Sequence, residues 1–348
     1  VTDVKFPRVQ VEFGAADAAV RLYGASRSEP PTFGTVEFLL PTRPGFRLPS
    51  GSGARSAAAP AAAFVDEPEP VEPIDVILAE LDAIVGQAQL KREVRGIVHQ
   101  VEINKLREAQ GLKPSRVGSH LVFAGPPGTG KTTVARLVAR LFHALGVLEA
   151  PVVHEVSRPD LVSSNVGGTD EKTSQVIADA MGGVLFIDEA YTLAEGGDND
   201  FGTQAIAVLM KELEDKRSEF VCIIAGYGDR MSAFMKANPG LASRFRPPVT
   251  FTSYAPDELL RIAAHMAAGM DNELTDEARS RLTARLADEE RRGGLERADW
   301  GNARAMRNVV EAAITHRDLR ISMSGARDRA SLVEIGADDV DAACDDLA

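Results

Sequence analysis

The fold is decided by one stretch of the sequence, Leu121-Val-Phe-Ala124-Gly125-Pro-Pro-Gly-Thr-Gly130-Lys131-Thr132. It opens with an apolar run, which is typical of a buried strand. The glycine-rich part that follows matches the pattern G-x-x-x-x-G-K-[ST] in full. Apolar residues then recur at helical spacing until Gly146, namely Val134, Leu137, Val138, Leu141, Phe142 and Leu145. A strand, a tight loop and a helix in this order predict a phosphate-binding site at the start of the helix.

The chemistry of phosphate binding explains each part of this loop. Glycine lets the backbone N–H groups turn inward around an anion, and the helix N-terminus adds the positive end of its dipole. We expect Lys131 to reach the β- and γ-phosphates and the Thr132 hydroxyl to ligate Mg²⁺. The residues expected to bind the nucleotide are Gly125, Pro126, Pro127, Gly128, Thr129, Gly130, Lys131, Thr132 and Thr133.

A second signal is the stretch Gly183-Val-Leu-Phe-Ile187-Asp188-Glu189-Ala190, in which a β-branched and aromatic run ends in two adjacent carboxylates. A buried strand would deliver Asp188 to the carboxyl edge of the sheet, where open α/β sheets bind their ligands. There Asp188 would complete the Mg²⁺ site. Glu189 would orient and polarise the attacking water as a general base. The predicted catalytic residues therefore include Lys131, Asp188 and Glu189, with Thr132 and Asp188 as metal ligands.

The remaining pattern predicts an α/β fold. Five apolar stretches have the length of buried strands, at residues 121–124, 152–156, 184–187, 220–225 and 249–251. Helical patterns lie between them, and a long charged helix is expected over about 90–110. This alternation predicts a five-stranded parallel sheet with helices on both faces. From Pro256 onward only helices are expected, over about 256–269, 275–291, 303–318 and 338–346, and they predict a C-terminal helical subdomain.

The N-terminal part differs in composition. Residues 1–49 contain short strand candidates at Val9–Phe13, Val20–Leu22 and Val36–Leu39, so we interpret them as a small β-rich appendage. Residues 50–73 are rich in Ala, Pro and acidic side chains and predict a flexible acidic linker. The other interpretation is that this segment docks across the next domain. The predicted boundaries then place an α/β core at 74–253 and the helical subdomain at 254–348.

Composition excludes several classes of protein. The net charge of -12 disfavours loose binding to nucleic acid, which needs many phosphate-neutralising cations. No stretch approaches the length of an apolar membrane span, and no signal peptide opens the sequence, so no membrane insertion is expected. The 2 cysteines cannot build a disulfide framework, which favours a reducing cytoplasm. The 6 histidines have no zinc-site spacing.

Four further stretches point to one family, namely Gly182-Gly-Val-Leu-Phe-Ile-Asp-Glu-Ala-Tyr191, Ala225-Gly-Tyr227, Asn238-Pro-Gly-Leu-Ala-Ser-Arg-Phe245 and Gly301-Asn-Ala-Arg-Ala-Met-Arg-Asn308. With the phosphate loop and the carboxylate pair, the sequence over about residues 74–346 resembles an AAA+ ATPase. More narrowly, it resembles the branch that contains the CbbX-type Rubisco activases, stage V sporulation protein K and the EccA ATPases of type VII secretion. The resemblance implies a P-loop AAA+ core with a C-terminal helical lid subdomain, and ATP and Mg²⁺ as cofactors.

The resemblance also implies that the active site is shared between subunits. Arg244, in the Ser-Arg-Phe stretch, resembles the arginine finger that enters a neighbouring subunit's site and stabilises charge on the transferred phosphoryl group. Arg246 is the alternative. A residue in this role requires a homo-oligomer, and the family implies a hexameric ring.

Residues that border the nucleotide are implied in the same way. Arg304 resembles the sensor-2 arginine of the lid, which contacts the nucleotide phosphates, and Arg307 is the alternative one helical turn on. Val85 and Gly86 resemble the turn that contacts adenine, although a plain helix break would have the same sequence.

Two stretches depart from the family pattern. The stretch Ala225-Gly-Tyr-Gly228 lacks the polar sensor-1 side chain that many AAA+ proteins carry after the fourth strand. The stretch from Asp160 to Thr169 resembles the central pore loop, yet Asn165 stands where relatives commonly carry a tyrosine. An aromatic side chain grips a threaded chain through apolar contact, which asparagine does less well. Local pulling on a partner is therefore expected rather than processive threading.

Taken together, the residues and the resemblance predict a Mg²⁺-dependent ATPase that forms a ring and remodels a protein partner. The alternative is a nucleotide-gated assembly or scaffold module with little turnover, which Asn165 in the pore-loop stretch keeps open, whereas Glu189 and Arg244 favour the enzyme. A DNA-handling ATPase is a third possibility that the acidic charge disfavours. The partner itself is not identified by the sequence.

Overall fold

The computed structural model describes residues 9–13, 18–22, 71–113, 120–165, 167–196, 201–297, 300–325 and 327–347. The chain divides into two compact units, Val1–Glu67 and Pro68–Ala348. In the first unit, β1 (Val9–Phe13) pairs antiparallel with β2 (Ala18–Leu22), which agrees with two of the expected strands. The third, at Val36–Leu39, lies outside the described residues. The boundaries of the appendage and the linker stay predictions.

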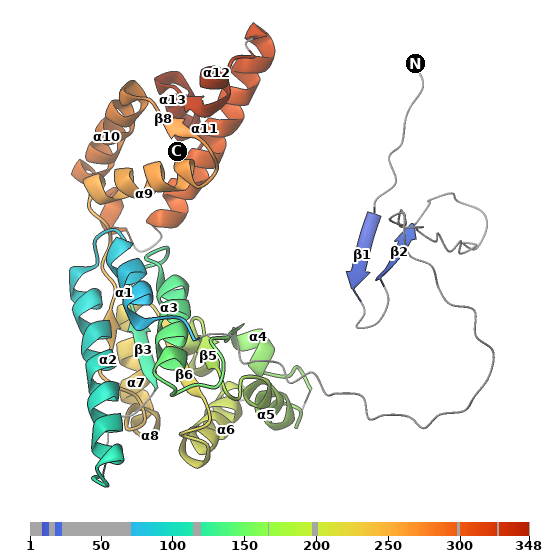
Figure 1. Ribbon diagram of the computed structural model, residues 1–348, viewed down its shortest axis with the longest axis vertical. Coiled ribbons are helices and arrows are strands. Elements are labelled where there is room, and N and C mark those ends of the chain that lie inside the picture. Colours follow the sequence, from blue (N-terminus) through green and yellow to red (C-terminus); the bar gives the residue numbers. More distant parts are fainter. Residues whose placement is uncertain are drawn as a thin grey trace, which may run out of the picture. The chain divides into compact units, whose positions relative to one another are not determined.

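The second unit is built on a five-stranded parallel sheet, as the sequence predicts (Figure 1). Its strands are β3 (Leu121–Ala124), β4 (Val153–Val156), β5 (Val184–Ile187), β6 (Val221–Gly226) and β7 (Val249–Thr250). They lie in the order β4-β5-β6-β3-β7, and every neighbouring pair is parallel. This order places the carboxyl ends of β3, β5 and β6 next to one another.

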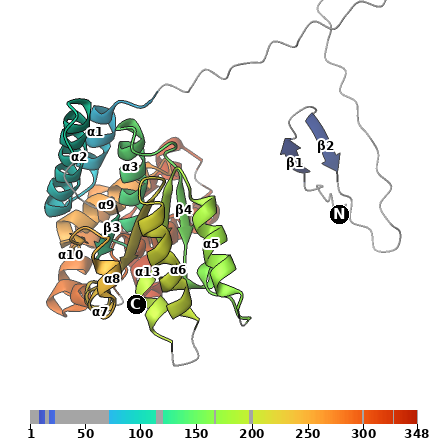
Figure 2. The same ribbon diagram turned by 90° about the horizontal axis from the view of Figure 1, so that it is seen from below.

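Helices cover both faces of the sheet (Figure 2). Helices α1 (Ile74–Ala83), α2 (Ala88–Ala109) and α3 (Lys131–Ala144) pack on one face, and α5 (Thr169–Asp179), α6 (Gly202–Asp215) and α7 (Gly228–Ala237) pack on the other. Side chains alternate along each strand, so Phe123 faces the first layer while Val122 faces the second. The connections include α4 (Arg158–Leu161), the 3-10 helix η1 (Ala190–Ala194) and α8 (Pro239–Ala242).

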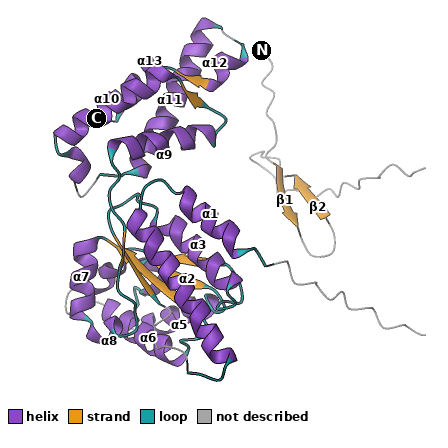
Figure 3. Cartoon of the chain, turned by 60° about the vertical axis from the view of Figure 1, so that its left-hand side comes forward, coloured by secondary structure: helices purple, strands orange, loops and turns teal. Residues whose placement is uncertain are grey.

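The C-terminal subdomain is mainly helical (Figure 3). It contains α9 (Pro256–Ala268), α10 (Asp276–Arg291), the 3-10 helix η2 (Gly294–Glu296), α11 (Ala303–Ser324), α12 (Arg329–Val333) and α13 (Ala337–Asp346). The expectation of helices alone is wrong, because β8 (Glu273–Leu274) pairs parallel with β9 (Glu334–Ile335). Strands of two residues are too short to produce a recognisable period. The predicted end of the third helix at 318 is also wrong, because α11 continues until Gly325 ends it at φ 70°.

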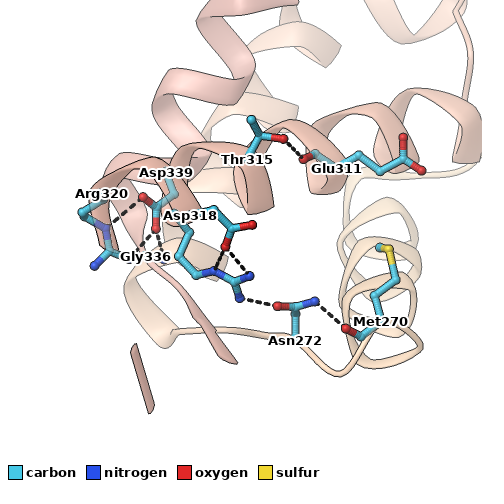
Figure 4. A network of polar contacts seen from close by, with 9 residues as sticks. Met270, Asn272, Glu311, Thr315, Asp318, Arg320, Gly336 and Asp339 are labelled. Atoms are coloured by element: carbon cyan, nitrogen blue, oxygen red, sulfur yellow. Dashed lines mark hydrogen bonds and ion pairs between the residues drawn. The ribbon is translucent and has the colours of Figure 1, made fainter. Parts of the chain in front are cut away.

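Polar contacts join the elements of this subdomain (Figure 4). The Arg317 guanidinium is buried and donates to Asn272 and to Asp318. One turn along α11, Arg320 donates to both carboxylate oxygens of Asp339, at 3.0 and 2.8 Å. The same carboxylate accepts from the N–H of Gly336, at 2.8 Å, and so joins the start of α13 to α11. These contacts therefore connect α11 with α13 and with the segment after α9.

The end of the expected linker is fixed to the core. Arg140 on α3 donates to the carboxylates of Glu72 and Glu80, and these hydrogen bonds hold the pKa of both glutamates below the usual range. Glu72 belongs to the predicted flexible segment 50–73, and this contact attaches the last residues of that segment to the core. Among the described helices, none combines the length and the apolar character needed to cross a membrane.

Candidate functional site

A cavity of about 980 Å³ lies at the carboxyl edge of the sheet, between the α/β core and the C-terminal subdomain. It brings together most of the residues expected to bind nucleotide. Its lining includes Val85, Pro127, Gly128, Thr129, Gly130, Lys131, Thr132, Thr133, Asp188, Glu189, Arg304 and Arg307. These residues come from the turn after α1, the loop after β3, the end of β5 and the start of α11. The predicted site is therefore one place in the structure.

The loop after β3 needs glycine at defined positions. Gly128 and Gly130 have φ values of 67° and 91°, a region that glycine adopts without strain. A Cβ on Gly128 would lie 1.9 Å from the carbonyl oxygen of Gly301 in the C-terminal subdomain. A side chain at this position is thus excluded both by the backbone conformation and by the closeness of the two subdomains. Gly130 directly precedes α3, so the loop presents its peptide groups at the N-terminus of a helix.

Lys131 is held by the loop itself. Its Nζ donates to the carbonyl oxygens of Gly125, at 3.1 Å, and Pro126, at 2.8 Å. Burial lowers the pKa of Lys131, and the negative charge of Asp188 partly offsets this effect. Gly125 and Pro126 are not among the residues that line this cavity, and their contact with nucleotide stays a prediction. Their carbonyls hold the ammonium group of Lys131 at the start of α3.

The two carboxylates stand where the sequence predicts them, directly after β5. The Oδ1 of Asp188 accepts from the N–H of Glu189, at 3.0 Å, and both residues are exposed to the cavity. Glu189 has φ 48°, a left-handed conformation that turns the chain into η1. Asp188 and Thr132 line the same cavity and supply one carboxylate and one hydroxyl. This donor set fits Mg²⁺, which binds few protein ligands and completes its shell with phosphates and water.

An aromatic cluster supports Glu189 and was not predicted from the sequence. The ring centroids of Tyr191 and Tyr227 lie 6.1 Å apart, and the Arg230 guanidinium lies 5.1 and 5.7 Å from them. Burial and the negative charge of Glu189 raise the pKa of Tyr191 to about 12. A Cβ on Gly226 would lie 2.7 Å from the Tyr191 ring, so glycine there makes room for the cluster. The signal in the sequence was a tyrosine close after each of two buried strands.

The C-terminal subdomain contributes two arginines. Arg304 and Arg307 both lie at the start of α11 and both line the cavity, so the structure keeps both as sensor-2 candidates. Val85 lines the cavity as expected, whereas Gly86 does not. Gly86 has φ 63°, and a Cβ there would lie 2.2 Å from the Glu258 carboxylate. The turn and its packing against α9 therefore require glycine at this position, and a contact of Gly86 with the nucleotide stays a prediction.

The expected arginine finger stands apart from this cavity. Arg244 follows α8, and it is not among the residues that line the cavity. Its guanidinium donates to the carbonyl of Gly240 and lies 3.3 Å from the Glu214 carboxylate, while its buried Nε has no hydrogen-bond partner among the described residues. The alternative, Arg246, donates to Gln100 on α2, at 2.8 Å. Neither arginine lines the nucleotide cavity of its own chain.

The chain matches two families of known domains. Residues 121–252 match the ATPase family associated with various cellular activities (AAA), and residues 255–348 match the AAA lid domain. Stage V sporulation protein K of Bacillus subtilis is 39% identical over 75% of this chain and 80% of its own length. The chloroplastic ribulose bisphosphate carboxylase/oxygenase activase of Cyanidioschyzon merolae is 38% identical over 77% of this chain and 91% of its own length.

A third relative is longer than the matched region. ESX-1 secretion system protein EccA1 of Mycolicibacterium smegmatis is 39% identical over 76% of this chain, and the match spans 48% of that protein. Among solved structures, the AAA domain of FIGL-1 in complex with ADP superposes with a TM-score of 0.54 at 16% identity, over 80% of this chain and 92% of that one. That likeness shows the fold.

The geometry and the comparisons agree. The cavity unites a phosphate loop, an Asp-Glu pair and arginines from the adjoining helical subdomain, and the sequence over the same residues matches an ATPase domain followed by its lid. The chain belongs to the AAA family of ATPases, and it is an ATP-hydrolysing enzyme with a C-terminal AAA lid domain.

Proposed function

We propose that this ATPase forms a hexameric ring, as the resemblance to its family implies, in which Mg²⁺·ATP binds between neighbouring subunits and hydrolysis remodels a protein partner. One observation carries the proposal: the nucleotide cavity gathers Lys131, Asp188, Glu189 and Arg304, while Arg244 stays outside it. The cavity contains each of the expected catalytic groups except the arginine finger. A neighbouring subunit would complete the site by supplying its own Arg244.

The residues of one chain have separate tasks in this proposal. The ammonium group of Lys131 leaves the carbonyls of Gly125 and Pro126 and moves onto the β- and γ-phosphates, which are stronger acceptors. Thr132 and Asp188 hold Mg²⁺, which neutralises charge on the phosphates when it is bound. The Glu189 carboxylate accepts a hydrogen bond from the attacking water and orients it in line with the leaving group.

Arg244 acts on the neighbouring subunit. Its present partner, the Glu214 carboxylate, has a side chain that is 56% exposed, and the pair lies 3.3 Å apart. A contact of this kind between partly exposed groups is weak and can be exchanged for a phosphate group. The guanidinium would then stabilise charge on the phosphoryl group that is transferred.

The partner is proposed to be a protein. Two of the relatives have names that refer to an activase of a carboxylase and to a secretion system, so proteins of this family serve different partners. In this chain Asn165 is exposed in the segment between α4 and α5, and its N–H donates to Ser163, at 3.1 Å. An exposed amide in this position suits local pulling on a folded partner more than continuous threading of a chain.

A trap variant tests the proposal. Glu189→Gln keeps the size of the side chain but removes the base, so it should bind ATP and hydrolyse it more than about a hundredfold more slowly. A protein that is retained by this variant with ATP and released with ADP, together with wild-type turnover, would support a remodelling ATPase. Stable assemblies without a partner or turnover would favour the nucleotide-gated scaffold, and salt-dependent DNA binding would favour a DNA-handling ATPase.

A further inference from the structure

Three consecutive carbonyl groups of the phosphate loop accept hydrogen bonds from the lid and from the segment that leads into it. The Pro127 carbonyl accepts from the Asn302 side-chain amide, at 3.1 Å, and the Gly128 carbonyl accepts from the Ala303 N–H, at 3.1 Å. The Thr129 carbonyl accepts from the Tyr254 hydroxyl, at 3.1 Å. We call these three contacts the carbonyl clamp.

The clamp determines where the opposite side of the loop points. A peptide group is planar and trans, so its N–H points away from its C=O. Holding the carbonyls of residues 127, 128 and 129 on the lid side therefore fixes the directions of the N–H groups of Gly128, Thr129 and Gly130. Backbone N–H groups of such a loop are the groups that bind phosphate oxygens. The clamp acts on the carbonyl face of the loop, which is remote from the ligand. It thereby orients the N–H groups on the opposite face for binding phosphate.

Asn302 is the centre of the clamp. It is fully buried, at 0% exposure, and its side-chain amide donates to the carbonyls of Pro127, at 3.1 Å, and Trp300, at 3.3 Å. Its Oδ1 accepts from the N–H of Tyr254, at 3.1 Å, in the segment between core and lid. One side chain therefore joins the phosphate loop, the connecting segment and the start of α11.

A role as an ordinary helix cap does not explain this residue. Asn302 precedes α11, yet its side chain makes no capping hydrogen bond to that helix. Its backbone has φ 48° and ψ -122°, a conformation that glycine adopts with less strain than asparagine. An asparagine in a conformation suited to glycine must be retained for its amide. All three side-chain bonds of that amide lead away from the helix.

We propose that Asn302, assisted by Tyr254, is the positioning residue that couples the lid to the phosphate loop. It holds the loop in its phosphate-binding conformation and sets the place of Arg304 and Arg307, which follow it within the first turns of α11. Because the clamp fixes the orientation of the peptide groups and ties them to the lid, a shift of the whole loop on phosphate binding is carried into the lid. This inference rests on the proposed nucleotide site and adds a lid movement that nucleotide drives, but its test needs nucleotide alone, so the result does not depend on a partner or on a ring.

The main test is Asn302→Gly, since glycine fits the backbone conformation and removes only the amide. Binding of Mg·ADP, measured by calorimetry, should weaken about tenfold, because the loop is no longer held ready for phosphate. Movement of the lid would be measured as the distance between two spin labels, attached at the exposed positions Glu108→Cys and Ala284→Cys. The labelled chain also carries Cys344→Ser, which removes a competing thiol, and it is diluted with unlabelled protein. The distance change on adding Mg·ADP should be lost.

A matched control separates coupling from stability. Asn272 is another largely buried asparagine, at 9% exposure, and its side-chain hydrogen bonds stay inside the lid: it accepts from Arg317 and donates to the Met270 carbonyl (Figure 4 labels Asn272 and Met270). Asn272→Ala should lower the melting temperature but leave Mg·ADP affinity and the distance change intact. Tyr254→Phe keeps the buried ring and removes one clamp contact, so it should weaken binding severalfold even if Asn302→Gly does not fold. Wild-type affinity and lid movement in Asn302→Gly, or in Tyr254→Phe when only that variant folds, would overturn the proposal.

Discussion

A buried histidine makes the core sensitive to acid. The ring of His120 lies between Phe220 and Phe245, with both centroid distances at 5.8 Å, and its Nδ1 accepts from the N–H of Cys222, at 3.0 Å. A proton on Nδ1 would break this hydrogen bond and place a charge in an apolar site. Burial is the main cause that lowers the pKa of His120 from 6.5 to about 4, and the positive charge of Arg244 adds to the effect.

The difference between the ordinary pKa of 6.5 and the folded-state pKa of about 4 determines the sign and the size of the effect on stability. Between pH 6.5 and pH 4 the unfolded chain binds a proton at His120 that the folded chain does not bind, so stability falls as the pH falls. The stabilisation is fully present above pH 6.5 and is lost progressively toward pH 4. Lowering the pH from about 7 to about 5 should cost about 2 kcal/mol of unfolding free energy through this group.

Urea unfolding at the two pH values, followed by circular dichroism, measures this loss. The matched variant is His120→Asn, whose side-chain oxygen can still accept from Cys222 but does not titrate. Other groups titrate equally in both proteins, so the wild type should lose about 2 kcal/mol more than the variant between the two pH values. If both proteins lose the same stability, His120 is not held neutral by burial and the reasoning is wrong.

Three further changes test the packing around the site. Gly128→Ala would place a methyl group 1.9 Å from a carbonyl oxygen of the lid, so Mg·ADP affinity measured by calorimetry should fall by at least about tenfold. Phe123→Ala removes a fully buried ring from the sheet and should lower the unfolding free energy by about 3–5 kcal/mol, measured in urea. Arg140→Ala should release Glu72 and speed proteolysis just before α1, whereas Arg136→Ala, which breaks an ion pair between the same helix and Glu155 on β4, should not.

The sheet was predictable because its central strands β3, β5 and β6 are buried on both faces. Such strands form continuous apolar runs, as Leu121–Ala124 and Val184–Ile187 show, and the runs fix the positions of the loops that follow them. The β8–β9 ladder was not predictable, because two residues of a strand define no period. The attachment of Glu72 depends on an arginine far along the chain, which composition alone cannot reveal.

The site was predictable where chemistry demands a fixed spacing and not where it depends on tertiary packing. Lys131, Asp188 and Glu189 meet in one cavity because strand ends and a tight loop determine their places. Asn302 and Tyr191 stand in stretches that resemble the family, but Asn302 contacts Pro127 and Tyr191 packs with Tyr227 and Arg230, which are all distant in sequence. The contact of Asn302 with Pro127 spans 175 positions, so only the fold can show it.

The most direct test of a site shared between subunits is a mixture of two inactive variants. Arg244→Ala keeps an intact nucleotide cavity, and Glu189→Gln keeps an intact finger. Each variant alone should have almost no ATPase activity. In an equal mixture about one quarter of the interfaces combine an intact cavity with an intact finger, so we predict about a quarter of wild-type activity. A mixture as inactive as its components, or full activity in Arg244→Ala alone, would contradict a site completed by the neighbouring subunit.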